Sequence, residues 1–103
     1  MKLEEFTADT FRPHTGSQFH VKVDETRTID LLLEEVKVVL EKHVSPRMNR
    51  DSFSLYFIGR ADVLLPQATY TVEHDALGSA AIFIVPVGRR HSTGEYLYEA
   101  AFT

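Results

Sequence analysis

Two short segments carry residue types that could act in acid–base chemistry or hold a metal ion. His14 stands between a proline and a Thr-Gly pair, and Glu73-His74-Asp75 places an imidazole between two carboxylates. A histidine beside a carboxylate can serve as a general base, and both kinds of side chain coordinate zinc. A small-ligand-binding or hydrolytic site built from His14, Glu73 and His74 is therefore one hypothesis for this chain.

A structural explanation competes with that hypothesis. Successive side chains on a strand point to opposite faces, so Glu73 and His74 cannot jointly bind one ion without help from elsewhere. His14, between proline and glycine, is typical of a turn histidine that bonds to nearby backbone, and His74 or Asp75 fits the same role at the turn that follows. The spacing of the remaining histidines fits no metal site, so the sequence predicts no metal and no cofactor.

The chain lacks the residues that other kinds of catalytic site need. The chain has no cysteine, which removes disulfides and thiolate nucleophiles. It has neither the Gly-x-Ser-x-Gly turn of serine hydrolases nor a glycine-rich phosphate loop. These absences favour a non-enzymatic protein.

Charge and hydropathy exclude further classes of partner. The net charge is −4, and the basic cluster Arg89-Arg90-His91 is too short to follow a phosphate backbone, so nucleic acid is not expected. No apolar run approaches the roughly 18 residues of a membrane span, and acidic residues interrupt the first segment where a signal peptide needs an apolar core. We expect a cytoplasmic product, or one exported by a route that needs no signal.

The clearest structural signal is the central stretch, residues 53–88. Residues 53–59, 68–74 and 81–85 alternate apolar and polar side chains, and a tight turn at residues 75–78 joins the last two. Gly78 can take positive φ there. The inward positions are predicted to be Phe53, Leu55, Phe57, Tyr70, Val72, Ile82 and Ile84.

Two features flank these strands. The connection over residues 60–67 is unusually apolar, so Leu64 and Leu65 are predicted to fold back over an open end of the sheet. Pro86 cannot donate a ladder hydrogen bond, which predicts that it ends the strand or places it at an edge.

Residues 29–42 fit two templates. A helical face and a strand with one change of register each leave some apolar residues on the wrong side. We favour the strand, because a β-bulge at Glu34-Glu35 would produce the register change after Leu33 and supply the twist that a small closed sheet needs. Residues 43–51 are predicted to form an exposed loop.

The remaining elements complete an all-β fold. Residues 19–23 and 96–102 alternate as strands, and a short N-terminal helical turn near residues 7–11 pins Phe6 and Phe11 to the core. Strands at this spacing predict a small antiparallel six-stranded barrel or two-layer sandwich, with the barrel favoured, as a single domain over residues 1–103.

An aromatic and aliphatic set could form a contact surface. If the residues opposite the core on the 81–85 strand are uncovered, they make an apolar patch suited to association. The candidate interaction residues are Phe83, Val85, Tyr96 and Tyr98, although core packing is the commoner role of such tyrosines.

Several motifs in combination also carry a resemblance. They are Phe11-x-Pro13-His14-x-Gly16-x-x-Phe19, Phe53-Ser54-Leu55-x-Phe57-x-Gly59, Leu64-Leu65-Pro66-Gln67-x-Thr69-Tyr70-x-x-Glu73-His74-x-x-Leu77-Gly78, Ile82-Phe83-Ile84-Val85-Pro86-Val87-Gly88 and Tyr98-Glu99-Ala100-x-Phe102. The chain resembles a family of roughly hundred-residue bacterial proteins of unknown function, some encoded near phage-tail-collar-like genes. That resemblance implies a structural or accessory role, with no catalytic residues to carry over.

The sequence therefore predicts a non-enzymatic structural or protein-interaction module, a subunit of a phage-tail-like or extracellular assembly. Its expected partner is another protein or a second copy of itself. The alternative is the ligand-binding or hydrolytic barrel described above.

Overall fold

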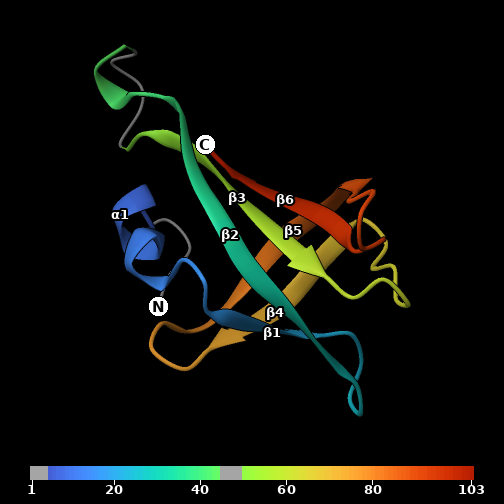
Figure 1. The fold of residues 1–103 in the computed structure, drawn as a ribbon. Coiled ribbons are helices and arrows are strands. Elements are labelled where there is room, and N and C mark those ends of the chain that lie inside the picture. The colour runs from blue at the N-terminus through green and yellow to red at the C-terminus, as the bar shows by residue number, and fades with distance from the viewer. Residues whose placement is uncertain (1–4, 45–49) are drawn as a thin grey trace.

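The computed structural model describes residues 5–44 and 50–103, and these residues form a barrel of antiparallel strands preceded by a short helical segment (Figure 1). The helical elements are α1 (Ala8–Phe11) and the 3₁₀ turns η2 (Arg12–His14) and η3 (Lys42–Val44). The strands are β1 (Gln18–Lys22), β2 (Thr28–Leu40), β3 (Ser52–Gly59), β4 (Ala68–His74), β5 (Gly78–Arg89) and β6 (Tyr96–Phe102).

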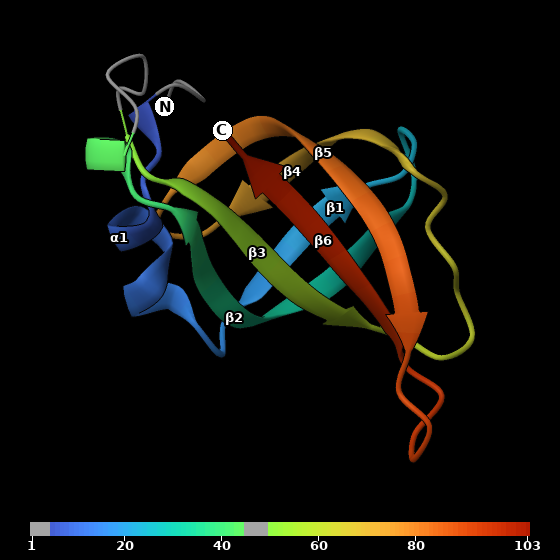
Figure 2. The ribbon, with the colours of Figure 1, turned by 90° about the horizontal axis from the view of Figure 1, so that it is seen from above.

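The strands close on themselves in the order β1-β2-β3-β6-β5-β4, and Figure 2 shows the resulting ring. Every neighbouring pair is antiparallel, and the ring closes where β4 returns to pair with β1. The predicted all-β class, the antiparallel six-stranded arrangement and the short N-terminal helix are confirmed for the described residues, and the barrel is the form adopted.

The ambiguous segment is a strand, as predicted. β2 pairs with β3 from Leu32 to Leu40, and the register shifts between Leu33 and Glu35, at the predicted bulge. A second shift falls between Val38 and Leu40. The first bulge lets this long strand coil around the barrel with Ile29, Leu31 and Leu33 buried before it and Val36 and Val38 packed against the core after it. Of the predicted loop over residues 43–51, residues 45–49 lie outside the described part.

The prediction for Pro86 is wrong. β5 continues through it to Arg89, and Pro86 pairs with Tyr98 of β6. A register shift between Pro86 and Gly88 makes this a bulge, where a missing N–H breaks no regular ladder bond. A closed sheet offers a proline no edge, so the bulge accommodates it instead.

Aromatic rings fill the end of the barrel that the N-terminal segment covers. Phe6 and Phe11 are buried and pack edge to face, with ring centroids 5.1 Å apart. Phe102 stacks on Phe53 at 4.7 Å. Arg50 then joins the two chain ends here, because its guanidinium donates to the carbonyl oxygens of Phe6 at 2.5 Å and Thr103 at 3.2 Å. The predicted plug is therefore present.

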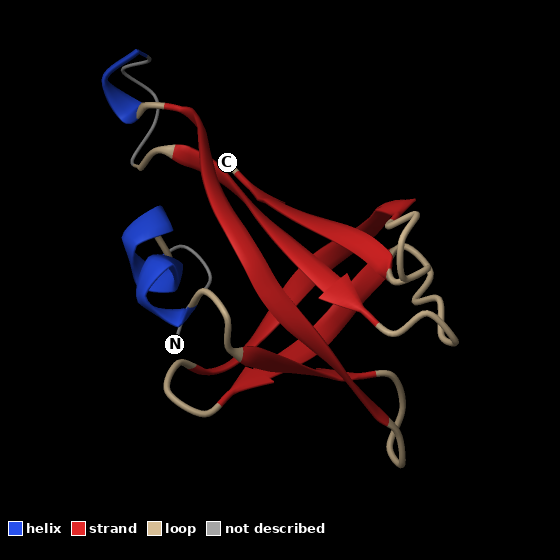
Figure 3. Ribbon diagram, in the orientation of Figure 1, coloured by secondary structure: helices blue, strands red, loops and turns tan. Residues whose placement is uncertain are grey.

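The loop between β3 and β4 covers the opposite end (Figures 1 and 3). Leu65 is buried as predicted, but Leu64 is 52% exposed, so only one of the pair folds back over the core. The Leu65 N–H donates to the hydroxyl of Tyr98 at 3.0 Å, and the Tyr70 hydroxyl donates to the Pro66 carbonyl. Within the described ranges, no helix is long and apolar enough to cross a membrane.

Candidate functional site

His74, the last residue of β4, forms the centre of a hydrogen-bond network at the end of the barrel that α1 covers. Its buried ring accepts hydrogen bonds at Nδ1 from the backbone N–H groups of Ala76 at 3.1 Å and Leu77 at 3.3 Å. Because Nδ1 accepts, the ring proton resides on Nε2, which donates to Ser17 Oγ at 2.9 Å. The Ser17 hydroxyl donates in turn to the His14 carbonyl at 2.5 Å.

These bond directions decide the chemistry of the pair. A serine nucleophile must give its proton to the histidine, whereas here the histidine donates to Ser17 and the serine proton is held by a carbonyl. Burial, and then the nearby His14, lower the pKa of His74, which favours the neutral ring. The predicted role of His74 as a residue that binds the backbone of the 75–78 turn is the one observed, and the described geometry is not that of a catalytic dyad.

His14 and His74 come together, but Glu73 does not join them. The two imidazole rings meet edge to face, with centroids 4.7 Å apart, and the ring centroid of Phe19 lies 4.4 Å from that of His74. Glu73 lies on the outside of the barrel and forms an ion pair with Lys22 at 2.9 Å. The three polar candidates therefore do not converge on one cavity, as the alternation of β4 predicts.

The interaction candidates also divide between the two faces of the barrel wall. Phe83 is 49% exposed and Val85 is half-buried, both on the outer side of β5. Tyr98 is only 1% exposed inside the barrel, and Tyr96 is half-buried beneath the guanidinium of Arg89, 4.6 Å from its ring centroid. Only Phe83 and Val85 of this set belong to an accessible outer surface.

Residues 6–102 match the model of a domain of unknown function, DUF6916. The chain belongs to this family. Comparison with curated proteins and with solved structures gives no match.

A second polar cluster in this DUF6916 chain lies on the outer wall, and sequence reasoning missed it. His20 Nδ1 bonds to Asp30 at 2.7 Å, and its Nε2 lies 3.5 Å from Asp75. The hydrogen bond to Asp30 raises the pKa of His20. The sequence feature that could have revealed this cluster is the register of the β1–β2 hairpin, which puts His20 opposite Asp30. In the part of the chain that the structure describes, no three histidine, aspartate or glutamate residues are grouped to hold a metal ion.

Proposed function

We propose that this chain is a non-enzymatic protein-interaction module that self-associates as a subunit of a larger protein assembly. Its contact surface is the uncharged face, formed by the outward side chains of β4 and β5. These are Thr69, Thr71, Ala81, Phe83, Val85 and Val87.

The observation that carries the proposal is the exposure of large apolar side chains on a stretch of β5 that has no charge. Phe83 and Val87 are each 49% exposed, and no residue from 78 to 88 is charged. Thr69 pairs with Phe83 and Thr71 with Ala81, so this part of β4 adds neutral side chains. Charged side chains border the face at Glu73, two residues beyond Thr71, and at Glu99 of β6, the register partner of Val85. Depletion of charge around an aromatic residue is typical of the centre of a protein–protein interface.

The closure of the barrel favours association through a face of side chains over association through a strand edge. Free strand edges are the usual route by which sheets join other chains, but within the described residues every strand has a partner on both sides. Association of closed barrels must then use side chains. A contact of standard size covers about 800 Å² per partner, which is about one eighth of the 6349 Å² surface.

Electrostatics favours a second copy on this face. The chain carries a net charge of −4, so two copies repel when their charged walls meet. The uncharged face borders the Lys22–Glu73 ion pair, since Lys22 is the register partner of Thr71, but its own side chains are neutral. It therefore lets copies approach with less repulsion than the charged walls do. The phage-tail-like or extracellular assembly implied by the resemblance is the setting that we propose for such repeated contacts.

Sedimentation velocity from micromolar to millimolar concentration tests the proposal. The natural chain should associate, and Phe83→Asp should weaken association about tenfold or more, because the change removes the aromatic anchor and puts like charges together. Leu64→Asp is the matched control, since it adds the same charge at an equally exposed apolar position outside the face. A chain that stays monomeric and binds no product of its neighbouring genes would refute the proposal, as would equal effects of the two variants.

A further inference from the structure

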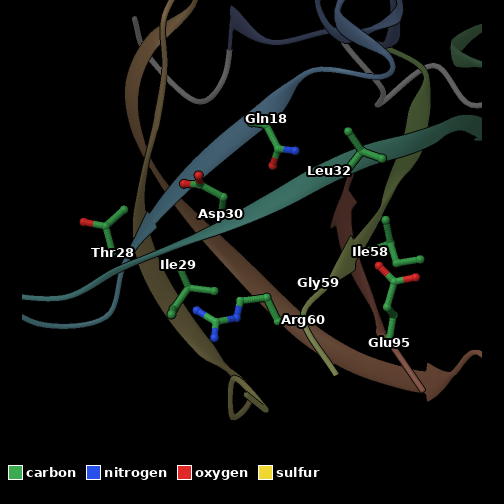
Figure 4. A pocket seen from close by; sticks show the side chains of 9 residues that line it. All are labelled: Gln18, Thr28, Ile29, Asp30, Leu32, Ile58, Gly59, Arg60 and Glu95. Atoms are coloured by element: carbon green, nitrogen blue, oxygen red, sulfur yellow. The ribbon is translucent and has the colours of Figure 1, made fainter. Parts of the chain in front are cut away.

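A groove lies on the outer wall of the barrel, on the β1-β2-β3 side (Figure 4). It has a volume of about 470 Å³, within the range of about 300–1,000 Å³ found for ligand sites. The residues that matter for its chemistry are Gln18, Asp30, Leu32, Ile58, Arg60 and Glu95.

The floor of the groove is apolar. Leu32 of β2 and Ile58 of β3 are register partners, and Ile58 pairs with Leu97 of β6 on its other side. Ile58 is only 6% exposed although it alternates with the inward residues of β3. This row of aliphatic side chains suits the methylene stem of a long side chain.

The rim carries an excess of negative charge. Arg60 is already bound by Asp62, through hydrogen bonds of 2.8 Å and 2.5 Å, and this contact raises the pKa of Arg60 and lowers that of Asp62. Asp30 uses one oxygen for His20. Glu95 is half-buried and, among the described residues, has no ion-pair partner.

We infer that this groove binds a lysine or arginine side chain presented by an extended segment of a second protein. The stem packs on Leu32 and Ile58, and the cationic head lies between Glu95 and Asp30, which Figure 4 shows on opposite sides of the groove. An anionic ligand is disfavoured because Asp62 already neutralises the cation that would receive it. The site is separate from the uncharged face, so the chain has one surface for its own copies and another for a basic partner.

Titration with a blocked Gly-Arg-Gly-Arg-Gly peptide, followed by ¹H–¹⁵N NMR, tests the inference. Amide shifts should concentrate at Gln18, Asp30, Ile58 and Glu95, and should weaken at high salt. The same peptide with glutamate in place of arginine should produce none of them. Glu95→Gln should raise the dissociation constant about two- to fivefold, the effect of one exposed ion pair.

Glu41→Gln is the matched control, because it removes the same charge just beyond the end of β2, outside the groove. It should leave the dissociation constant unchanged. Shifts scattered over the whole acidic surface, or equal losses in the Glu95 and Glu41 variants, would overturn the inference. Phe83→Asp should weaken self-association while peptide binding persists, so the failure of one proposal is distinguishable from failure of the other.

Discussion

The buried His74 should make the folded chain sensitive to mild acid. Its Nδ1 accepts two backbone N–H groups, so a proton added there would point at two donors and break both bonds of the 75–78 turn. The titratable groups facing it are His14 and His20, which lower its pKa after the larger effect of burial, and Asp75, which opposes them. Protonation would therefore disrupt both the turn and the contact with the N-terminal plug.

The direction of the pH effect on stability follows because the pKa of His74 is lower in the folded chain than in the unfolded chain. Above pH 6.5, the ordinary pKa of histidine, neither state binds the proton and the full stability is present. As the pH falls below that value the unfolded chain is protonated first. The free energy of unfolding then falls by up to about 1.4 kcal/mol per pH unit until the folded-state pKa is reached. His20 has the opposite effect on stability. Because its pKa is raised in the folded chain, its contribution to the free energy of unfolding is fully present below pH 6.5 and is lost as the pH rises through the folded-state pKa.

Urea denaturation of His74→Asn across this pH range measures the effect. Asparagine can still accept from the turn, but it loses the bond to Ser17, the packing on Phe19 and the titration. We expect a loss of about 1–3 kcal/mol above neutral pH, and a gap to the natural chain that narrows as the pH falls. His91→Asn, in the exposed loop after β5, should keep the natural pH profile.

Parallel stability curves for His74→Asn and the natural chain would refute this reasoning. So would an NMR titration in which the His74 ring has a pKa at or above 6.5.

Two further predictions concern the end of the barrel that the 60–67 loop covers. Tyr98→Phe should destabilise the fold by about 1–3 kcal/mol in urea denaturation, because the buried Leu65 N–H loses its acceptor; an unchanged midpoint would show that another acceptor replaces it. Gly59→Ala should cost about 1–3 kcal/mol in thermal or urea denaturation, because a Cβ there would lie 2.6 Å from Leu31 Cδ2 in the packed core. Gly88→Ala, where a Cβ meets nothing within 4 Å, is the control, and equal losses at the two glycines would contradict the packing argument.

Local pattern was enough to predict the strands and the bulge. Before and at Leu33 the apolar residues of β2 that face the core fall on odd positions, and after it they fall on even positions. In a strand that is buried on one face, such a change is explained most simply by one extra residue, a β-bulge. Pro86 shows where local reasoning fails. Whether a proline marks an edge depends on the neighbours of its strand, and the closure that gives β5 two neighbours is a property of the whole chain.

The candidate site was less accessible to sequence reasoning. Ser17 and His74 are 57 positions apart, and they meet because barrel closure and the N-terminal plug bring the start of β1 to the end of β4. No local spacing encodes that approach. The separation of Glu73 from His74 was predictable because it follows from the alternation of a single strand.

The ladder that closes the ring is also its shortest among the described residues, since it joins residues 20–22 of β1 only to residues 71–73 of β4. By contrast, the β3–β6 ladder extends from Phe53 to Gly59. If the ring opens, it does so at lowest cost along the shortest ladder, and the freed edges of β1 and β4 are complementary to those of any identical molecule. Two opened chains could pair β1 of each molecule with β4 of the other and rebuild the broken ladder between molecules. These few residue pairs therefore determine how well the monomer resists domain swapping.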